Sequence, residues 1–478
     1  MSRESEKLYD GVTNIDDAII ERAQEAKPKR RRFYRKWMGA VAAALAIAML
    51  AGVLLRNPFG RSGTTVNASY VIAQAIYPEA PPYPTNENAP NFSEQYQAWF
   101  RDVRSRMDVR GADAVTVFGA DAARHYLAGA GTENRVVSPL NVYLALAVLA
   151  ELTDGESRAQ ILNLLRVEDV ETLREQASEL WNAGYRDDGA SASLLASSVW
   201  LSEDVNFVPK TMQTLADVYY ASSYRGEMGS DGFNEALRAW LNENTGGLLE
   251  EQAADVELDA EALLALATTV YFRAKWAGEF RKESTAPGAF HAPGGDVTCE
   301  MMHGGADGYY WGERFSAVVR RLDAMMGAMY FILPDEGVSV DELLADDEAL
   351  RFLQAPNGWE NAAYPIIRLT LPRFDVVSDF DLSAGLKALG VTDVFDWQTA
   401  DFTPMTRDMP TYVSKAEHAA RVTVDEEGVV AAAYTVLAMS GGGMPPEDEI
   451  DFTLDRPFLF AITGAQGLPL FVGVVNQP

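Results

Sequence analysis

Cysteine is almost absent from this chain of 478 residues, in which Cys299 is the only one. An intrachain disulfide is therefore excluded. A catalytic thiol would also need a histidine and an orienting group, and no pattern in the sequence points to such a set. We therefore interpret Cys299 as a small side chain with a packing role.

Histidine and basic residues are scarce as well. The four histidines are scattered without the spacing of metal ligands, so we expect neither a metal nor another cofactor. Forty lysine and arginine residues stand against 69 aspartate and glutamate residues, a net charge of −29. So acidic a chain repels nucleic acid, which we exclude as a partner. The motifs of α/β-hydrolases, zinc proteases and P-loop enzymes are missing, so we expect no enzyme.

Positive charge is concentrated just before a long apolar run. Residues 1–36 carry ten basic and seven acidic residues, so the rest of the chain has a net charge of −32. Residues 37–55 carry no charge, and a helix of that length spans about 28 Å, close to the hydrocarbon core of a bilayer. The basic flank predicts a cytoplasmic N-terminus and an extracellular C-terminal part of a single-pass membrane protein. The alternative is a cleaved signal peptide, with secretion of the remainder.

The sequence divides into four parts. Residues 1–36 form a cytoplasmic basic segment, and residues 37–55 form the transmembrane anchor. Residues 56–110 are rich in proline, which predicts a spacer, with one short helix expected at 93–107. From residue 111 to residue 478, helical and strand patterns alternate without repeats or regular βαβ spacing. That pattern favours one α+β domain.

Motifs in this last part resemble those of the serpin family, and they occur in the family's order. They are 134–141 (NRVVSPLN), 240–247 (WLNENTGG), 268–280 (TTVYFRAKWAGEF), 328–334 (AMYFILP), 369–374 (LTLPRF), 422–433 (VTVDEEGVVAAA), 455–460 (DRPFLF) and 469–478 (PLFVGVVNQP). The chain is thus similar to a membrane-anchored, bacterial-type serpin. The resemblance implies the α+β serpin fold, with a large central β-sheet, smaller sheets, about nine helices and an exposed reactive loop, here preceded by one transmembrane helix.

The resemblance also implies an inhibitor of serine-type endopeptidases. In inhibitory members a protease cuts the reactive loop, which then inserts as a middle strand of the main sheet while the acylated protease is trapped. Residues 428–444 contain no proline and no charge, as a buried strand requires. Period-two alternation places Val429, Ala431, Ala433, Thr435, Leu437 and Met439 on one apolar face.

The resemblance also places the parts of the loop, because positions in inhibitory relatives are counted from a glutamate in the hinge. The hinge comprises Glu426, Glu427, Gly428, Val429, Val430, Ala431, Ala432 and Ala433. The reactive bond then falls between Gly442 and Gly443, with Met439, Ser440 and Met444 as alternatives. Because the loop contains no lysine or arginine, the expected partner is an elastase-like or subtilisin-like serine protease.

Two further sites follow from the resemblance. Ser138, Asn141, Thr268 and His418 align with a buried hydrogen-bond cluster under the main sheet, where it opens. Thr268 and Asn141 differ from the family's usual Asn and Ser, so we expect a rearranged set of hydrogen bonds. Trp276 aligns with a packing residue at the top of the sheet, the breach.

Three other functions stay open at this point. The chain could be a non-inhibitory serpin that acts as a surface binding or structural protein. It could also be an anchored regulator that binds a partner through residues 1–36, or a secreted hydrolase whose catalytic triad is dispersed along the sequence. We expect a monomer in each case.

Overall fold

The computed structural model describes residues 66–85, 90–107, 109–247, 250–254, 256–413, 416–429, 448–464 and 467–478. Gly63–Pro478 form one compact unit. The predicted anchor at 37–55 lies outside the described residues. Among the residues that are described, no helix combines the length and the apolar composition needed to span a bilayer.

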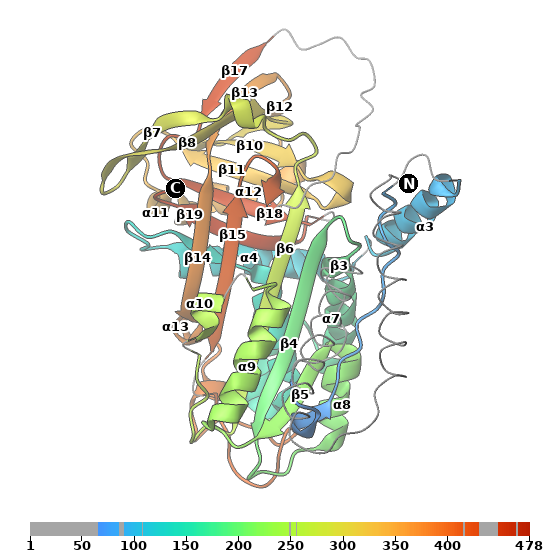
Figure 1. Ribbon diagram of the computed structural model, residues 1–478. Coiled ribbons are helices and arrows are strands. Elements are labelled where there is room, and N and C mark those ends of the chain that lie inside the picture. Colours follow the sequence, from blue (N-terminus) through green and yellow to red (C-terminus); the bar gives the residue numbers. More distant parts are fainter. Residues whose placement is uncertain are drawn as a thin grey trace, which may run out of the picture. The chain divides into compact units, whose positions relative to one another are not determined.

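A sheet of eight strands forms the centre of the unit (Figure 1). Its order is β1-β5-β4-β6-β16-β15-β14, and β3 also pairs with β4. The strands are β1 (Val71–Ala73), β3 (Arg186–Asp187), β4 (Ala192–Ser202), β5 (Ala221–Gly226), β6 (Leu264–Lys275), β14 (Phe374–Asp381), β15 (Glu417–Val424) and β16 (Gly428–Val429). All residues of β4 are buried, because helices cover both faces of the sheet.

Two smaller sheets pack at one end of the main sheet (Figure 1). One has the order β12-β9-β10-β11-β18-β19-β2 and the other β17-β13-β8-β7. The first contains β2 (Arg135–Val137), β9 (Gly308–Trp311), β10 (Phe315–Arg321), β11 (Ala328–Pro334), β12 (Ala362–Ala363), β18 (Phe458–Thr463) and β19 (Pro469–Val475). The second contains β7 (Ala286–Ala292), β8 (Gly295–Gly305), β13 (Ile366–Pro372) and β17 (Glu449–Thr453).

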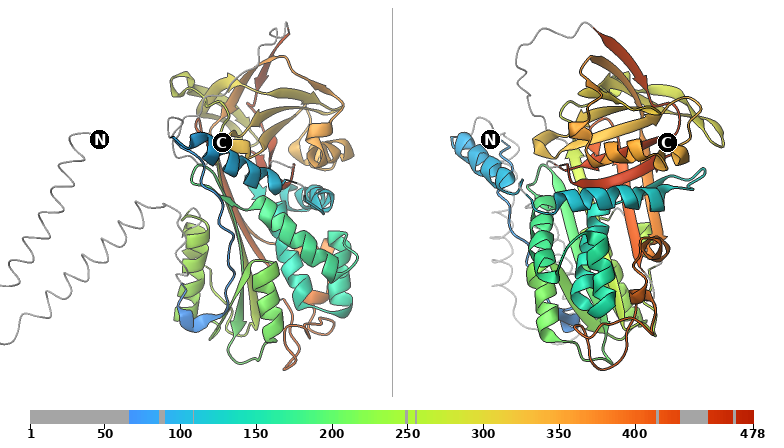
Figure 2. Two further views of the ribbon diagram at one scale, coloured as in Figure 1. Left: turned by 90° about the vertical axis from the view of Figure 1, so that its right-hand side faces the viewer. Right: turned by 180° about the vertical axis from the view of Figure 1, so that it is seen from behind.

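Helices cover the main sheet on both sides (Figure 2). Helix α9 (Asp231–Asn244) crosses one face, where Trp200 and Tyr224 pack under Phe233 and Trp240. The opposite face carries α4 (Ala112–Leu127), α5 (Pro139–Leu152), α6 (Gly155–Leu165) and α7 (Val170–Gly184). The other helices are α8 (Pro209–Val218), α10 (Glu250–Ala254), α11 (Val340–Leu344), α12 (Asp347–Gln354) and α13 (Ser383–Ala388). From α4 onward the described chain thus has ten α-helices, against about nine expected.

The described part of the predicted spacer packs on the domain. Strand β1 extends the main sheet beside β5, and Tyr77 stacks on Trp181 at 5.1 Å between ring centroids. Helix α3 (Phe92–Ser105) forms where the sequence predicted a helix at 93–107. Its Trp99 is buried and donates its indole N–H to Asp188 at 2.9 Å. Aromatic side chains supply the apolar surface for this docking, which the proline content alone did not reveal.

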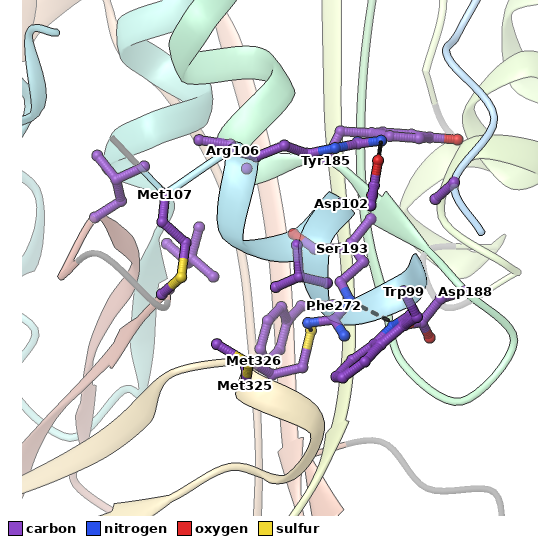
Figure 3. A pocket seen from close by; sticks show the side chains of 18 of the residues that line it. Trp99, Asp102, Arg106, Met107, Tyr185, Asp188, Ser193, Phe272, Met325 and Met326 are labelled. Atoms are coloured by element: carbon purple, nitrogen blue, oxygen red, sulfur yellow. Dashed lines mark hydrogen bonds and ion pairs between the residues drawn. The ribbon is translucent and has the colours of Figure 1, made fainter. Parts of the chain in front are cut away.

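A cavity of about 60 Å³ lies beneath α3 (Figure 3). Phe272 of β6 lines it together with Met325 and Met326, which precede β11. Met107, just after α3, lines it as well. Helix α3 therefore covers a seam between the main sheet and the sheet that contains β11.

Candidate functional site

The described hinge begins as a short strand inside the main sheet. Strand β16 lies between β6 and β15, where Val429 pairs with Ala274 of β6 and with Val424 of β15. Val429 is only 1% exposed. Gly428 is required at its position, because a Cβ atom there would collide with the carbonyl oxygen of Ala274. The main sheet thus already holds two hinge residues in its middle.

Within the described residues, β6 and β15 are joined through β16 alone. The ladder of β6 on its other side runs along β4, from Leu264 paired with Leu201 to Arg273 paired with Ala192. Strand β15 likewise pairs with β14 on its far side over its whole length. The two strands that flank β16 are therefore firmly paired only on the sides away from it.

Just before β16, the buried side chain of Glu426 forms an ion pair with the partly exposed Arg373. Its carboxylate accepts hydrogen bonds from the guanidinium of Arg373, at 2.9 and 3.0 Å from Nε, and from the hydroxyl of Thr285 at 2.6 Å. Burial by itself would raise the pKa of Glu426, but the hydrogen bonds from Arg373 and Thr285 outweigh it and hold the pKa below its usual value. A charged residue at this depth is tolerated because it is paired.

The neighbours of Glu426 fix the backbone of the hinge. Asp425 accepts the amide N–H groups of Glu427 at 2.9 Å and of Gly428 at 3.1 Å. Glu427 forms an ion pair with Lys282. Asp425, Glu426 and Glu427 thus all have partners just before β16, and the Asp425 carboxylate also holds the amide of Gly428, where the strand begins.

Trp276 contacts the hinge directly as well as packing at the breach. Its indole N–H donates to the carbonyl oxygen of Asp425 at 2.9 Å, and its amide N–H donates to that of Glu427 at 3.1 Å. Arg320 lies 5.1 Å from the Trp276 ring, and burial lowers the pKa of Arg320 to about 10. The sequence predicted the packing role, and the structure adds two hydrogen bonds to the hinge.

The structure brings the four residues of the predicted cluster together beneath the sheet. Ser138 caps α5 and donates its amide N–H to Nε2 of His418 at 3.2 Å. Asn141 donates from its side-chain amide to the hydroxyl of Thr268 at 3.2 Å. Asn141 and Thr268, the two positions that depart from the usual family residues, therefore bond to each other. This hydrogen bond explains why both positions differ together.

His418 should make the protein's stability depend on pH. Burial lowers its pKa to about 4, against about 6.5 in an unfolded chain. Below pH 6.5 the unfolded state therefore binds a proton that the folded state does not. We expect the free energy of unfolding to fall as the pH drops from about 6.5 to about 4, by about 3 kcal/mol in all. Urea unfolding of the wild type and of His418→Gln across this range checks it: equal pH slopes would contradict the assignment.

Several predicted residues lie outside the described part of the chain. They are Val430, Ala431, Ala432 and Ala433 of the hinge, the bond Gly442–Gly443, and its alternatives Met439, Ser440 and Met444.

Conversely, the sequence analysis did not identify Arg373, Thr285 or Lys282 as partners of the hinge. The signal was present for Arg373, which sits in the motif LTLPRF. A buried glutamate ahead of an uncharged strand requires a cation nearby.

Comparison with known proteins agrees with this geometry. A family profile described as "Serpin (serine protease inhibitor)" matches residues 113–478. The chain is 28% identical over 396 residues to Serpin-ZX of Arabidopsis thaliana, covering 78% of this chain and all of the relative. It is 28% identical to the leukocyte elastase inhibitor of Homo sapiens, covering 72% and 93%. The crystal structure of the thermophilic serpin tengpin in the native state superposes with a TM-score of 0.69 at 25% identity, covering 78% and 95%.

Proposed function

Since this chain belongs to the serpin family, we propose that it inhibits serine-type endopeptidases by inserting its cleaved loop into the main sheet and trapping the acylated protease. Serpins in general are protease inhibitors rather than enzymes. The observation that carries the inhibitory mechanism is β16, whose residues Gly428 and Val429 already pair with β6 and β15. A strand that starts between two others can be extended there without breaking existing ladders.

The register of β16 supports the proposal. Continuing the pairing of Val429 with Ala274 and Val424 along both flanking strands would place Thr435 opposite Thr268 and His418. The same continuation keeps alternate loop residues on the face of Val429, which the sequence predicts to be apolar. Insertion would thus bring Thr435 onto the cluster beneath the sheet.

The proposed target is an elastase-like or subtilisin-like serine protease. The loop offers small and unbranched apolar residues around the proposed bond Gly442–Gly443 and no basic residue. A relative is named leukocyte elastase inhibitor, in keeping with such a target. We propose that the inhibitor acts as a monomer.

We further propose display on the outer side of a membrane. Residues 37–55 would anchor the chain as a bacterial-type single-pass protein, with residues 1–36 cytoplasmic and the serpin domain extracellular. Secretion after cleavage of a signal peptide is the alternative. Protease added outside intact cells should remove the serpin domain from cells that carry an anchored chain, and should find none on cells that secrete it.

A gel of the full-length chain incubated with pancreatic elastase tests inhibition. The expected result is an SDS-stable complex with the combined mass of both proteins, together with a released peptide of residues 443–478 identified by its mass. Elastase whose catalytic serine has been blocked is the control, because it cannot form the acyl bond and should give no complex. Cleavage of the loop without any complex would favour the non-inhibitory serpin instead.

A further inference from the structure

One wall of the cavity beneath α3 is set by the register of the main sheet. Arg186 of β3 pairs with Ser193 of β4, and Ser193 pairs in turn with Phe272 of β6. Residues that are directly opposite each other on adjacent strands place their side chains on the same face of a sheet. All three line the cavity, and Figure 3 shows Ser193 and Phe272 beside it.

Helix α3 and its C-cap residue form a second wall. They contribute Trp99, Asp102, Val103 and Arg106. The guanidinium of Arg186 lies 5.0 Å from the centroid of the Trp99 ring, so the two walls meet there. The family profile begins at residue 113, after α3. The cavity is therefore built in part from residues outside the match to the family.

Two buried polar atoms on the sheet wall have no hydrogen-bond partner among the described residues. They are Oγ of Ser193, a residue that is 3% exposed, and Nη2 of Arg186, whose side chain is 11% exposed. Nη1 of Arg186 meets only the sulfur of Met326 at 3.3 Å, which is a weak acceptor. Buried polar groups without partners are costly and rare in proteins. The wall thus offers two hydrogen-bond donors to a ligand.

The carboxylates on the walls already accept hydrogen bonds. Asp188 accepts four, one of them from Nε of Arg186 at 2.7 Å. Asp102 accepts one from Arg106 at 3.0 Å. The charges of these two aspartates and two arginines cancel. A charged ligand would therefore be left without a counter-charge, and a ligand with donors of its own would find the carboxylates engaged.

The remaining side chains limit the size and polarity of a ligand. Met325, Met326, Leu468 and Leu470 add apolar surface to that of Phe272. Methionine side chains adapt to the shape of a bound group. A water molecule requires about 10–15 Å³ of such space, so about 60 Å³ accommodates about five non-hydrogen atoms.

We propose that this cavity binds a small uncharged carbonyl compound of about five non-hydrogen atoms. Its carbonyl oxygen accepts hydrogen bonds from Oγ of Ser193 and Nη2 of Arg186, and its apolar part lies against Phe272, Met325 and Met326. Butanone has this composition and serves as the probe. The proposal does not depend on the inhibitory function above.

Methyl NMR of the full-length chain, labelled with ¹³C at the methionine methyl groups, tests the site. Butanone should shift the signals of Met325 and Met326 with a Kd of about 1 mM, a reasonable affinity for so small a ligand. Met302, which is buried and does not line the cavity, should not respond. The variants Met325→Leu and Met326→Leu identify the two signals. Propionate has as many non-hydrogen atoms but is charged, and it should bind at least about tenfold more weakly.

Two serine variants test the donors. Ser193→Ala removes one hydrogen bond and should raise the Kd of butanone about fivefold. Ser223→Ala is the matched control, because Ser223 of β5 is also buried, and its Oγ also lacks a partner in the described part of the chain. Since Ser223 does not line the cavity, this variant should keep the wild-type Kd.

Each other result would overturn the proposal. Unchanged signals of Met325 and Met326 at about 50 mM butanone would mean that the cavity takes up water only. Equal shifts of methionines throughout the chain would indicate an effect of butanone on the solvent. Propionate binding as tightly as butanone would contradict the uncharged class of ligand. An equal Kd for Ser193→Ala and the wild type would contradict the role of the Ser193 hydroxyl.

Discussion

Val429→Arg is expected to convert the inhibitor into a substrate. Val429 is 1% exposed and lies between Ala274 and Val424, so an arginine there would place an unpaired charge between two buried strands. Such burial costs several kcal/mol. The protease would still cut the loop, but insertion would be slow enough for the acyl bond to be hydrolysed first. Densitometry of SDS gels should show cleaved chain and free elastase in place of the complex.

Two variants serve as controls for that result. Val429→Thr keeps the volume and the β-branched shape without a charge, and it should still give complex. Ile76→Arg adds the same charge at a residue that is 83% exposed, and it should behave as the wild type does. If Val429→Arg gave as much complex as these variants, extension of β16 by the cut loop would not depend on an uncharged residue between Ala274 and Val424.

Local patterns in the sequence predicted an α+β domain, whereas the serpin fold and the hinge were predicted from the resemblance of motifs along the chain to that family. The alternation of residues 428–439 predicted a buried side chain at Val429, and Val429 is 1% exposed, while residues 430–439 lie outside the described part of the chain. Ser138 followed by Pro139 marks the start of α5, and the structure has Ser138 as its cap. Features of this kind depend on residues that are close in the chain.

The side chains that bind the hinge could not be predicted from local patterns. Arg373 is 53 residues from Glu426, and Thr285 is 141 residues from it. Only the fold of the smaller sheets brings these residues together, and no periodicity in the sequence encodes that. The two hydrogen bonds from Trp276 were missed for the same reason, since a tryptophan in an apolar motif indicates burial and does not say where its N–H group points.

The proline-rich segment that precedes residue 111 shows a second limit of prediction from sequence. Proline-rich composition predicts an extended chain, and residues 66–85 do lack helices longer than one turn among the described positions. Composition does not report whether such a chain finds a partner surface. Here Tyr77 stacks on Trp181 and Trp99 donates a hydrogen bond to Asp188, and these contacts bind the segment to the domain.

Cleavage of the loop should raise the thermal midpoint on the order of 20 °C. Insertion along the register of β16 would bury about 400 Å² of apolar surface from the loop, which stabilises the protein by about 10 kcal/mol. For a domain of this size each kcal/mol shifts the midpoint by about 2 °C. Calorimetry of the chain before and after elastase treatment measures the shift.

Cleaving the Val429→Arg variant in the same way identifies the cause of this stabilisation. Both proteins lose the constraint of an intact loop when they are cut, so relief of that constraint alone would raise both midpoints equally. Only the wild type can extend β16, because its Val429 fits between Ala274 and Val424. A large shift in the wild type with little shift in the variant would attribute the free energy to the added strand. An unchanged midpoint in the cut wild type would mean that the described sheet is already at its lowest free energy, and that no energy remains to deform a protease.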